Sequence, residues 1–182
     1  MSDTGRATRQ IILSAGQIAE SIERMAQPMK PLARDGSLAL VGIQRRGVPL
    51  AERLRAVIAP DNPESVPLGK LDITLYRDDL STLGPQPILG PTRLPFEIDD
   101  RVIMLVDDVL YTGRTVRAAL EALLAFGRPR AVRLAVLIDR GHREYPIQAD
   151  FVGQTVGTTD RQIVEVMLAE IDPKERVVLV TR

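Results

Sequence analysis

Two neighbouring carboxylates, Asp107 and Asp108, follow the apolar run of residues 102–106 and precede a short polar loop. A continuous apolar run of this length predicts a strand buried on both faces, as parallel sheets require. Ligands of open α/β sheets bind outside the carboxyl ends of the strands. We therefore expect the two carboxylates to face a ligand at the end of this strand.

The residues after the acidic pair have the composition of a phosphate-binding loop. Apolar residues recur at helical spacing from Val116 onward, which predicts a helix that opens at residues 112–115. The unpaired N–H groups and the dipole of a helix N-terminus favour an anion.

Carboxylates repel a polyphosphate, but they accept hydrogen bonds from sugar hydroxyls and suit Mg²⁺. The pattern predicts a sugar phosphate, with its hydroxyls or a Mg²⁺ ion on Asp107 and Asp108. An acidic turn between an ordinary strand and helix is the alternative. The predicted phosphate loop comprises Val109, Leu110, Tyr111, Thr112, Gly113, Arg114 and Thr115.

A second basic loop follows another predicted strand. Residues 38–43 are apolar, residues 49–58 have helical periodicity, and Arg45, Arg46 and Gly47 lie between them. Arginine donors suit phosphate oxygens, and glycine permits an unusual backbone, so this loop is a candidate diphosphate site. Two solvated arginines at the start of a helix are the alternative.

A polar, proline-rich segment over residues 77–87 follows a predicted strand over residues 66–76. A loop of this length within a compact domain is usually functional or disordered. Arg77 stands at its start, and a plain surface excursion is the alternative.

Together these motifs resemble those of the type I phosphoribosyltransferases. The wording of residues 106–118 is similar to that of the pyrimidine operon regulatory proteins that double as uracil phosphoribosyltransferases. The similarity continues in residues 41–47, 71–81 and 134–144, and it spans about residues 11–170. It implies an α/β fold with a central, mostly parallel sheet flanked by helices. It also implies a small hood built from about residues 139–160 and the chain ends, within one domain over residues 1–182.

The resemblance also implies roles for the residues. The activity would convert uracil and 5-phosphoribosyl 1-diphosphate to UMP and diphosphate with Mg²⁺, and Asp107, Asp108 and Arg77 would act in catalysis. The Arg45–Gly47 loop would bind diphosphate, often through a cis peptide in this family, and the loop after Arg77 would close over the substrate. Asp139, Arg140 and Val156 would contact the base. A transferase for another base, or a regulator whose nucleotide site only senses, remains an alternative.

RNA binding is the second activity that the resemblance implies, with leader mRNA of pyrimidine genes as the partner and UMP as the effector. Arg45 and Arg143 are the candidate RNA contacts. The family pattern has a Thr at Glu23, a His at Gln27, an Arg at Gln148 and a Lys at Gln154, so this chain carries less positive charge on that face. Arg45 restores one charge, since a Thr is usual there.

Composition sets broader bounds. The chain has 182 residues and no cysteine, which excludes disulfide and thiolate chemistry. No apolar run approaches the ~18 residues of a membrane span, so we expect a cytoplasmic protein without a membrane partner. The family suggests a homodimer or homotetramer.

Three further elements are predicted outside these motifs. Ser14 and Gln17 form a capping box that predicts a helix over residues 14–32, kinked or shortened at Pro28. Residues 131–138 predict another buried strand. Alternation over residues 163–166 and 176–180 predicts two short late strands.

Overall fold

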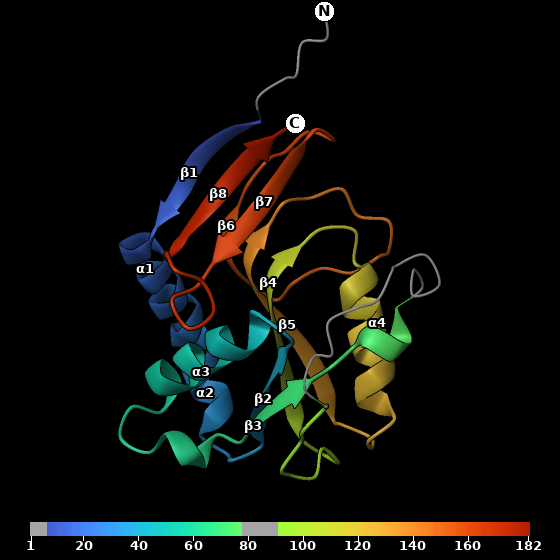
Figure 1. Ribbon diagram of the computed structural model, residues 1–182. Coiled ribbons are helices and arrows are strands. Elements are labelled where there is room, and N and C mark those ends of the chain that lie inside the picture. The colour runs from blue at the N-terminus through green and yellow to red at the C-terminus, as the bar shows by residue number, and fades with distance from the viewer. Residues whose placement is uncertain (1–6, 78–90) are drawn as a thin grey trace, which may run out of the picture.

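A parallel sheet of five strands forms the centre of the part of the chain that the structure, a computed structural model, describes: residues 7–77 and 91–182 (Figure 1). The strand order is β3-β2-β4-β5-β6, and every neighbouring pair is parallel. The predicted α/β fold with a mostly parallel sheet is thus confirmed. The strands are β2 (Leu38–Ile43), β3 (Leu68–Leu71), β4 (Val102–Leu110), β5 (Ala131–Asp139) and β6 (Phe151–Thr155).

Helices cover both faces of this sheet (Figure 1). Helices α1 (Ala15–Ala26) and α3 (Gly47–Ile58) pack on one face, and α4 (Arg114–Leu124) packs on the other. Strand β4 serves both cores because successive side chains of a strand point to opposite faces. Its residues Met104 and Val106 join the core of α1 and α3, whereas Ile103 and Leu105 join that of α4. In the described ranges, no helix has the length and apolar character needed to cross a membrane.

A separate antiparallel sheet stands over one end of the central sheet (Figure 1). Its order is β1-β8-β7, with β1 at Thr8–Ser14, β7 at Gln162–Met167 and β8 at Arg176–Thr181. The two late strands were predicted, but β1 was not. Most of β1 is solvent-exposed and Leu13 is its one buried residue, so its sequence shows little of the alternation that marks a strand. Segment 151–155, expected in the hood, instead pairs with β5 as strand β6 of the central sheet.

The helix predicted over residues 14–32 is divided. The capping box of Ser14 and Gln17 is present, and α1 ends at Ala26. A 3₁₀ turn at Gln27–Met29 and a short helix α2 at Lys30–Ala33 follow, each with a proline near its start. Proline lacks the N–H that a continuous helix needs, which accounts for the break.

The strand predicted over residues 66–76 was wrong beyond Leu71, where β3 ends. The Asp72 carboxylate accepts hydrogen bonds from the backbone N–H of Thr74 at 2.9 Å and from its hydroxyl at 2.6 Å. This local bond offers the backbone an alternative to the strand ladder. Residues Thr74–Tyr76 form a 3₁₀ turn instead, and Leu75 points into solvent.

Candidate active site

A cavity of about 220 Å³ opens where β2 and β4 approach their carboxyl ends. Its walls come from segments far apart in the sequence: the residues after β2, the turn after β3, the end of β4 and the first turn of α4. It brings together the acidic pair, both loop arginines and Arg77. The predicted site residues in its lining are Arg45, Arg46, Arg77, Asp107, Asp108, Val109 and Thr115.

The acidic pair lies within β4 rather than after it, because the strand continues to Leu110. Strand β2 stops pairing with β4 at Val106, whereas β5 pairs with β4 beyond that point. The two carboxylates therefore lie beyond the pairing with β2, while β5 still pairs with this part of β4. The Asp107 carboxylate accepts the N–H of Asp108 at 2.9 Å, and the Asp108 carboxylate accepts the N–H of Val109 at the same distance.

Burial dominates the electrostatics of this pair. It raises the pKa of Asp107 well above the ordinary value, and the neighbouring charge of Asp108 raises it further. Burial also raises the pKa of Asp108, although the hydrogen bond with Asp107 and the positive charge of Arg46 oppose that rise. The protein thus holds two carboxylates where negative charge is unfavourable until a cation or hydroxyl donor arrives.

The basic loop after β2 approaches β4 closely. The peptide bond between Gln44 and Arg45 is cis, as the family resemblance implied for this loop. Gly47 is required for a different reason from the one predicted. A Cβ atom there would lie 2.2 Å from the carbonyl oxygen of Val106, so only glycine lets the start of α3 sit against β4 beside the acidic pair.

The predicted phosphate loop leads directly into α4. Gly113 precedes the helix with a φ of 91°, a conformation that favours glycine, and the helix begins at Arg114. Thr115 of the first turn lines the cavity. Arg114 itself donates to the Glu144 carboxylate at 2.7 Å and lies over the ring of Tyr145, so it supports the loop from outside the cavity lining.

The predicted base-contacting residues bind one another and the phosphate loop. Arg140 is buried, stacks at 3.9 Å on the ring of Tyr111 and donates to the hydroxyl of Thr158. Asp139 accepts the N–H of Gly141 and the guanidinium of Arg143.

The guanidinium of Arg143 also donates to the carbonyls of Tyr111 and Ile147 at 2.7 and 2.9 Å, so it holds loops together rather than reaching into solvent. Val156 donates its N–H to the carbonyl of Asp139 and packs on the core.

Sequence reasoning missed Gln44, Ile73, Thr74 and Asp172. The first three line the cavity, and Asp172 forms an ion pair with Arg46 at 2.8 Å. Thr74 was assigned to a strand, and Asp172 lies in a polar turn between β7 and β8 with no signal in the sequence. The predicted lid lies outside the described residues except for Arg77, which lines the cavity.

A metal ion at this site would depend on the acidic pair. Among the residues that the structure describes, no cluster of three or more His, Cys, Asp or Glu side chains could hold an ion alone. Mg²⁺ commonly takes one or two carboxylates and completes its shell with water and substrate oxygens. Asp107 and Asp108 fit an ion shared with a phosphorylated substrate.

The family follows from comparison with known proteins. A family model described as "Phosphoribosyl transferase domain" matches residues 9–171, which include every strand of the central sheet and the residues lining the cavity. The chain belongs to the phosphoribosyl transferase family.

Several relatives share half of their sequence with this chain. The bifunctional protein PyrR of Pelotomaculum thermopropionicum is 54% identical over 169 residues, covering 92% of this chain and 93% of the relative. The protein of the same name from Thermus aquaticus is 51% identical over 170 residues, with 92% and 93% covered. The similarity therefore extends over nearly the full length of both proteins.

Solved structures support the fold. A hypoxanthine phosphoribosyltransferase of Trypanosoma cruzi superposes with a TM-score of 0.69 at 17% identity, covering 95% of this chain and 96% of that chain. One from Staphylococcus aureus gives the same TM-score and identity, with 95% and 92% covered. At this identity, the likeness speaks for the fold alone.

Proposed function

We propose that this protein is a uracil phosphoribosyltransferase that forms UMP and diphosphate from uracil and 5-phosphoribosyl 1-diphosphate. The observation that carries the proposal is the cavity whose lining combines Arg45, Arg46 and Arg77 with the carboxylates of Asp107 and Asp108. Such a site offers cations to a diphosphate and carboxylates to the hydroxyls of a sugar. The family membership and the PyrR relatives support the same class of reaction.

The reaction is a displacement at the anomeric carbon. The bond from that carbon to the diphosphate oxygen breaks with its electron pair going to the diphosphate, the bond to the uracil N1 forms, and the N1 proton passes to solvent. Positive charge develops on the ribose as the diphosphate departs. Asp107 and Asp108 would hold the ribose hydroxyls with negative charge near that centre, while the arginines stabilise the leaving group.

The start of α4 would bind the 5′-phosphate. Gly113 precedes the helix in a left-handed conformation, and Thr115 of its first turn lines the cavity. Mg²⁺, held through Asp107 and Asp108 directly or through water, would neutralise diphosphate charge when bound. Arg140 would act on the bound base only indirectly, because its guanidinium packs on the ring of Tyr111 in the predicted phosphate loop.

Product analysis tests the proposal. The protein is incubated with phosphoribosyl diphosphate, Mg²⁺ and either uracil, hypoxanthine or orotate, and nucleotides are separated by chromatography. UMP from uracil alone is the expected result. A nucleotide from one of the other bases alone would keep the reaction class and overturn the base. No product from any base would favour a nucleotide sensor.

A second function, RNA binding that responds to UMP, is proposed because the relatives are named bifunctional proteins. Three positions that the resemblance assigns to RNA are exposed, namely Glu23 in α1, Gln27 just after it and Gln154 in β6, and α1 packs against β6.

A further inference from the structure

Arg46 of the basic loop is held by a carboxylate from the antiparallel sheet. Its Nε and Nη2 atoms donate to the two carboxylate oxygens of Asp172, at 3.2 and 2.8 Å. Both side chains are largely shielded, with 31% of the Arg46 side chain and 16% of the Asp172 side chain exposed. Arg46 also lines the cavity, so one guanidinium is shared between the proposed diphosphate site and an internal partner.

The geometry of this pair matches the geometry of phosphate recognition. A guanidinium binds a carboxylate or a phosphate through the same planar fork of two parallel N–H donors. The fork formed by Nε and Nη2 of Arg46 is already engaged by Asp172. A diphosphate that needs this fork must displace the carboxylate.

We propose that Asp172 occupies Arg46 in the ligand-free protein and competes with the diphosphate group of substrate and product for it. The inference rests on the proposed function for the identity of the ligand. Asp172 would thereby weaken diphosphate binding and ease its release after the reaction. A role in which Asp172 only orients Arg46 toward the ligand predicts the opposite effect on affinity.

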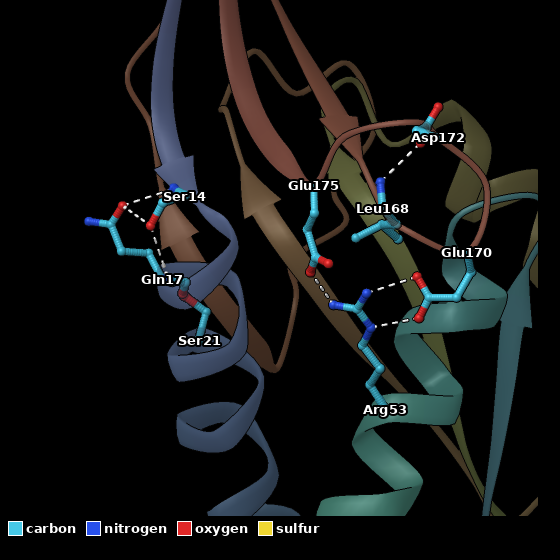
Figure 2. Close-up of polar contacts among 8 residues, drawn as sticks. All are labelled: Ser14, Gln17, Ser21, Arg53, Leu168, Glu170, Asp172 and Glu175. Carbon is cyan, nitrogen blue, oxygen red and sulfur yellow. Dashed lines mark hydrogen bonds and ion pairs between the residues drawn. The ribbon is translucent and has the colours of Figure 1, made fainter.

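The loop that carries Asp172 has a second anchor, so it can release Arg46 without coming loose (Figure 2). Arg53 lies seven residues after Arg46, two turns along α3 on the same face. Its guanidinium binds both oxygens of Glu170 at 2.8 Å and also binds Glu175. Asp172 itself accepts the N–H of Leu168, a bond that Asn can also accept.

The experiment measures the affinity of inorganic diphosphate by calorimetry, with and without Mg²⁺. Asp172→Asn keeps the shape of the side chain and removes the charge that competes for Arg46. We expect it to bind diphosphate about twofold to fivefold more tightly than the natural protein, the range for a partly exposed ion pair. Glu170→Gln is the matched control: it removes a charge from the same loop and should leave the affinity unchanged, because Glu170 binds Arg53.

A second pair of variants tests whether Asp172 acts through Arg46. In the background of Arg46→Ala, which should itself weaken diphosphate binding, Asp172→Asn should change the affinity less than twofold. The proposed competition would be overturned if Asp172→Asn alone weakened diphosphate binding. It would also be overturned if Asp172→Asn raised the affinity equally with and without Arg46. If the natural protein fails to bind diphosphate and forms no nucleotide, the proposed function fails. If the natural protein binds diphosphate but Asp172→Asn does not tighten that binding, only this inference is overturned.

Discussion

At the scale of single residues, the acidic pair of Asp107 and Asp108 carries negative charge in a shielded site. Asp107 is only 7% exposed. Burial, and after it the charge of Asp108, raises the pKa of Asp107. Two neighbouring carboxylates in a shielded site destabilise a fold when their charges are only partly compensated. The pair is therefore expected to favour catalysis at the expense of the stability of the ligand-free protein.

Asp107→Asn or Asp108→Asn should abolish most turnover while the fold remains intact. Each substitution keeps the side-chain oxygen that accepts a backbone N–H and removes one of two repelling charges. The melting temperature of the ligand-free protein should stay equal or rise, and kcat should fall at least a hundredfold, the usual scale for loss of transition-state charge stabilisation. Steady-state kinetics and thermal denaturation on the same samples measure both. Near-normal rates would show that the two carboxylates have no role in catalysis.

Gly47→Ala should destabilise the protein by about 1–3 kcal/mol, the usual cost of overpacking. Its new Cβ atom would meet the Val106 carbonyl oxygen at 2.2 Å, and two stretches of backbone would have to separate. The diphosphate loop would shift with them, so activity should fall as well. Chemical denaturation gives the free energy of unfolding.

Gly16→Ala is the control for this prediction. A Cβ atom on Gly16 comes no closer than 4.0 Å to the Ser14 hydroxyl, and the residue lies in helix α1. Alanine there should stabilise by about 0.5–1 kcal/mol, since glycine is unfavourable in helices. Equal effects of the two substitutions would show that the contact with Val106 carries no weight.

At the scale of elements, helix α3 connects the diphosphate loop to the antiparallel sheet. Arg46 at its start binds Asp172, and Arg53 two turns later binds Glu170 and Glu175. All three acids lie in or next to the turn between β7 and β8, which is thereby fixed along one face of the helix (Figure 2).

This attachment should weaken in acid. The hydrogen bond from Arg53 lowers the pKa of Glu170 below its ordinary value of 4.5, despite the opposing effect of burial. A carboxyl with a lowered pKa stabilises the fold fully above its ordinary value, and the contribution is lost as the pH falls through the lowered one. Glu170→Gln should therefore lower the melting temperature at neutral pH and flatten its fall toward about pH 3.

Glu64→Gln provides the comparison. Glu64 pairs with Arg55 of the same helix, but its side chain is 83% exposed, so the pair should contribute little. Its acid profile should parallel that of the natural protein. Parallel profiles for Glu170→Gln as well would show that the turn is held by other contacts.

The elements that were predicted well from the sequence are those whose burial shows as a run of apolar residues within one segment. Residues 102–106 are a continuous apolar run, residues 131–138 are apolar except for Arg133, and both segments form central strands. The acidic pair lines the cavity even though β4 runs past it, because the pairing of β2 with β4 ends at Val106. Strand β1 and the turn at Thr74–Tyr76 were not foreseen, since an exposed edge strand and an aspartate-stabilised turn carry no periodic signal.

At the scale of the whole molecule, contacts between distant segments were the hardest to predict. The pairing of β1 with β8 joins the two ends of the described chain, and Asp172 reaches Arg46 from 126 residues away. Nothing in a local pattern encodes such a partner. The family resemblance supplied the roles of the arginines, but only the fold shows that Arg143 is occupied by Asp139 and the carbonyls of neighbouring loops.

The face proposed for RNA is also an arrangement of distant elements. The end of α1 lies against β6, where Arg24 donates to the Gly153 carbonyl, so exposed Glu23 and Gln154 belong to neighbouring elements. Where RNA-binding members of the family carry a Thr and a Lys, this chain has a carboxylate and an amide. Arg143 is engaged internally, which removes a further cation from the face.

RNA binding by this chain should therefore be weak, with a shallow dependence on salt. Each phosphate contact that is lost removes a counterion-release contribution and lowers the slope of log affinity against log salt by about one unit. A filter-binding titration against the leader RNA of its own pyrimidine genes, with and without UMP, measures affinity and slope together.

The double variant Glu23→Thr/Gln154→Lys should tighten binding at least tenfold and steepen the slope by about one unit for the one restored contact. Its uracil phosphoribosyltransferase rate should stay unchanged, because neither residue lines the cavity. Nanomolar, UMP-enhanced binding with a steep slope in the natural protein would contradict the prediction and show that other arginines contact the RNA.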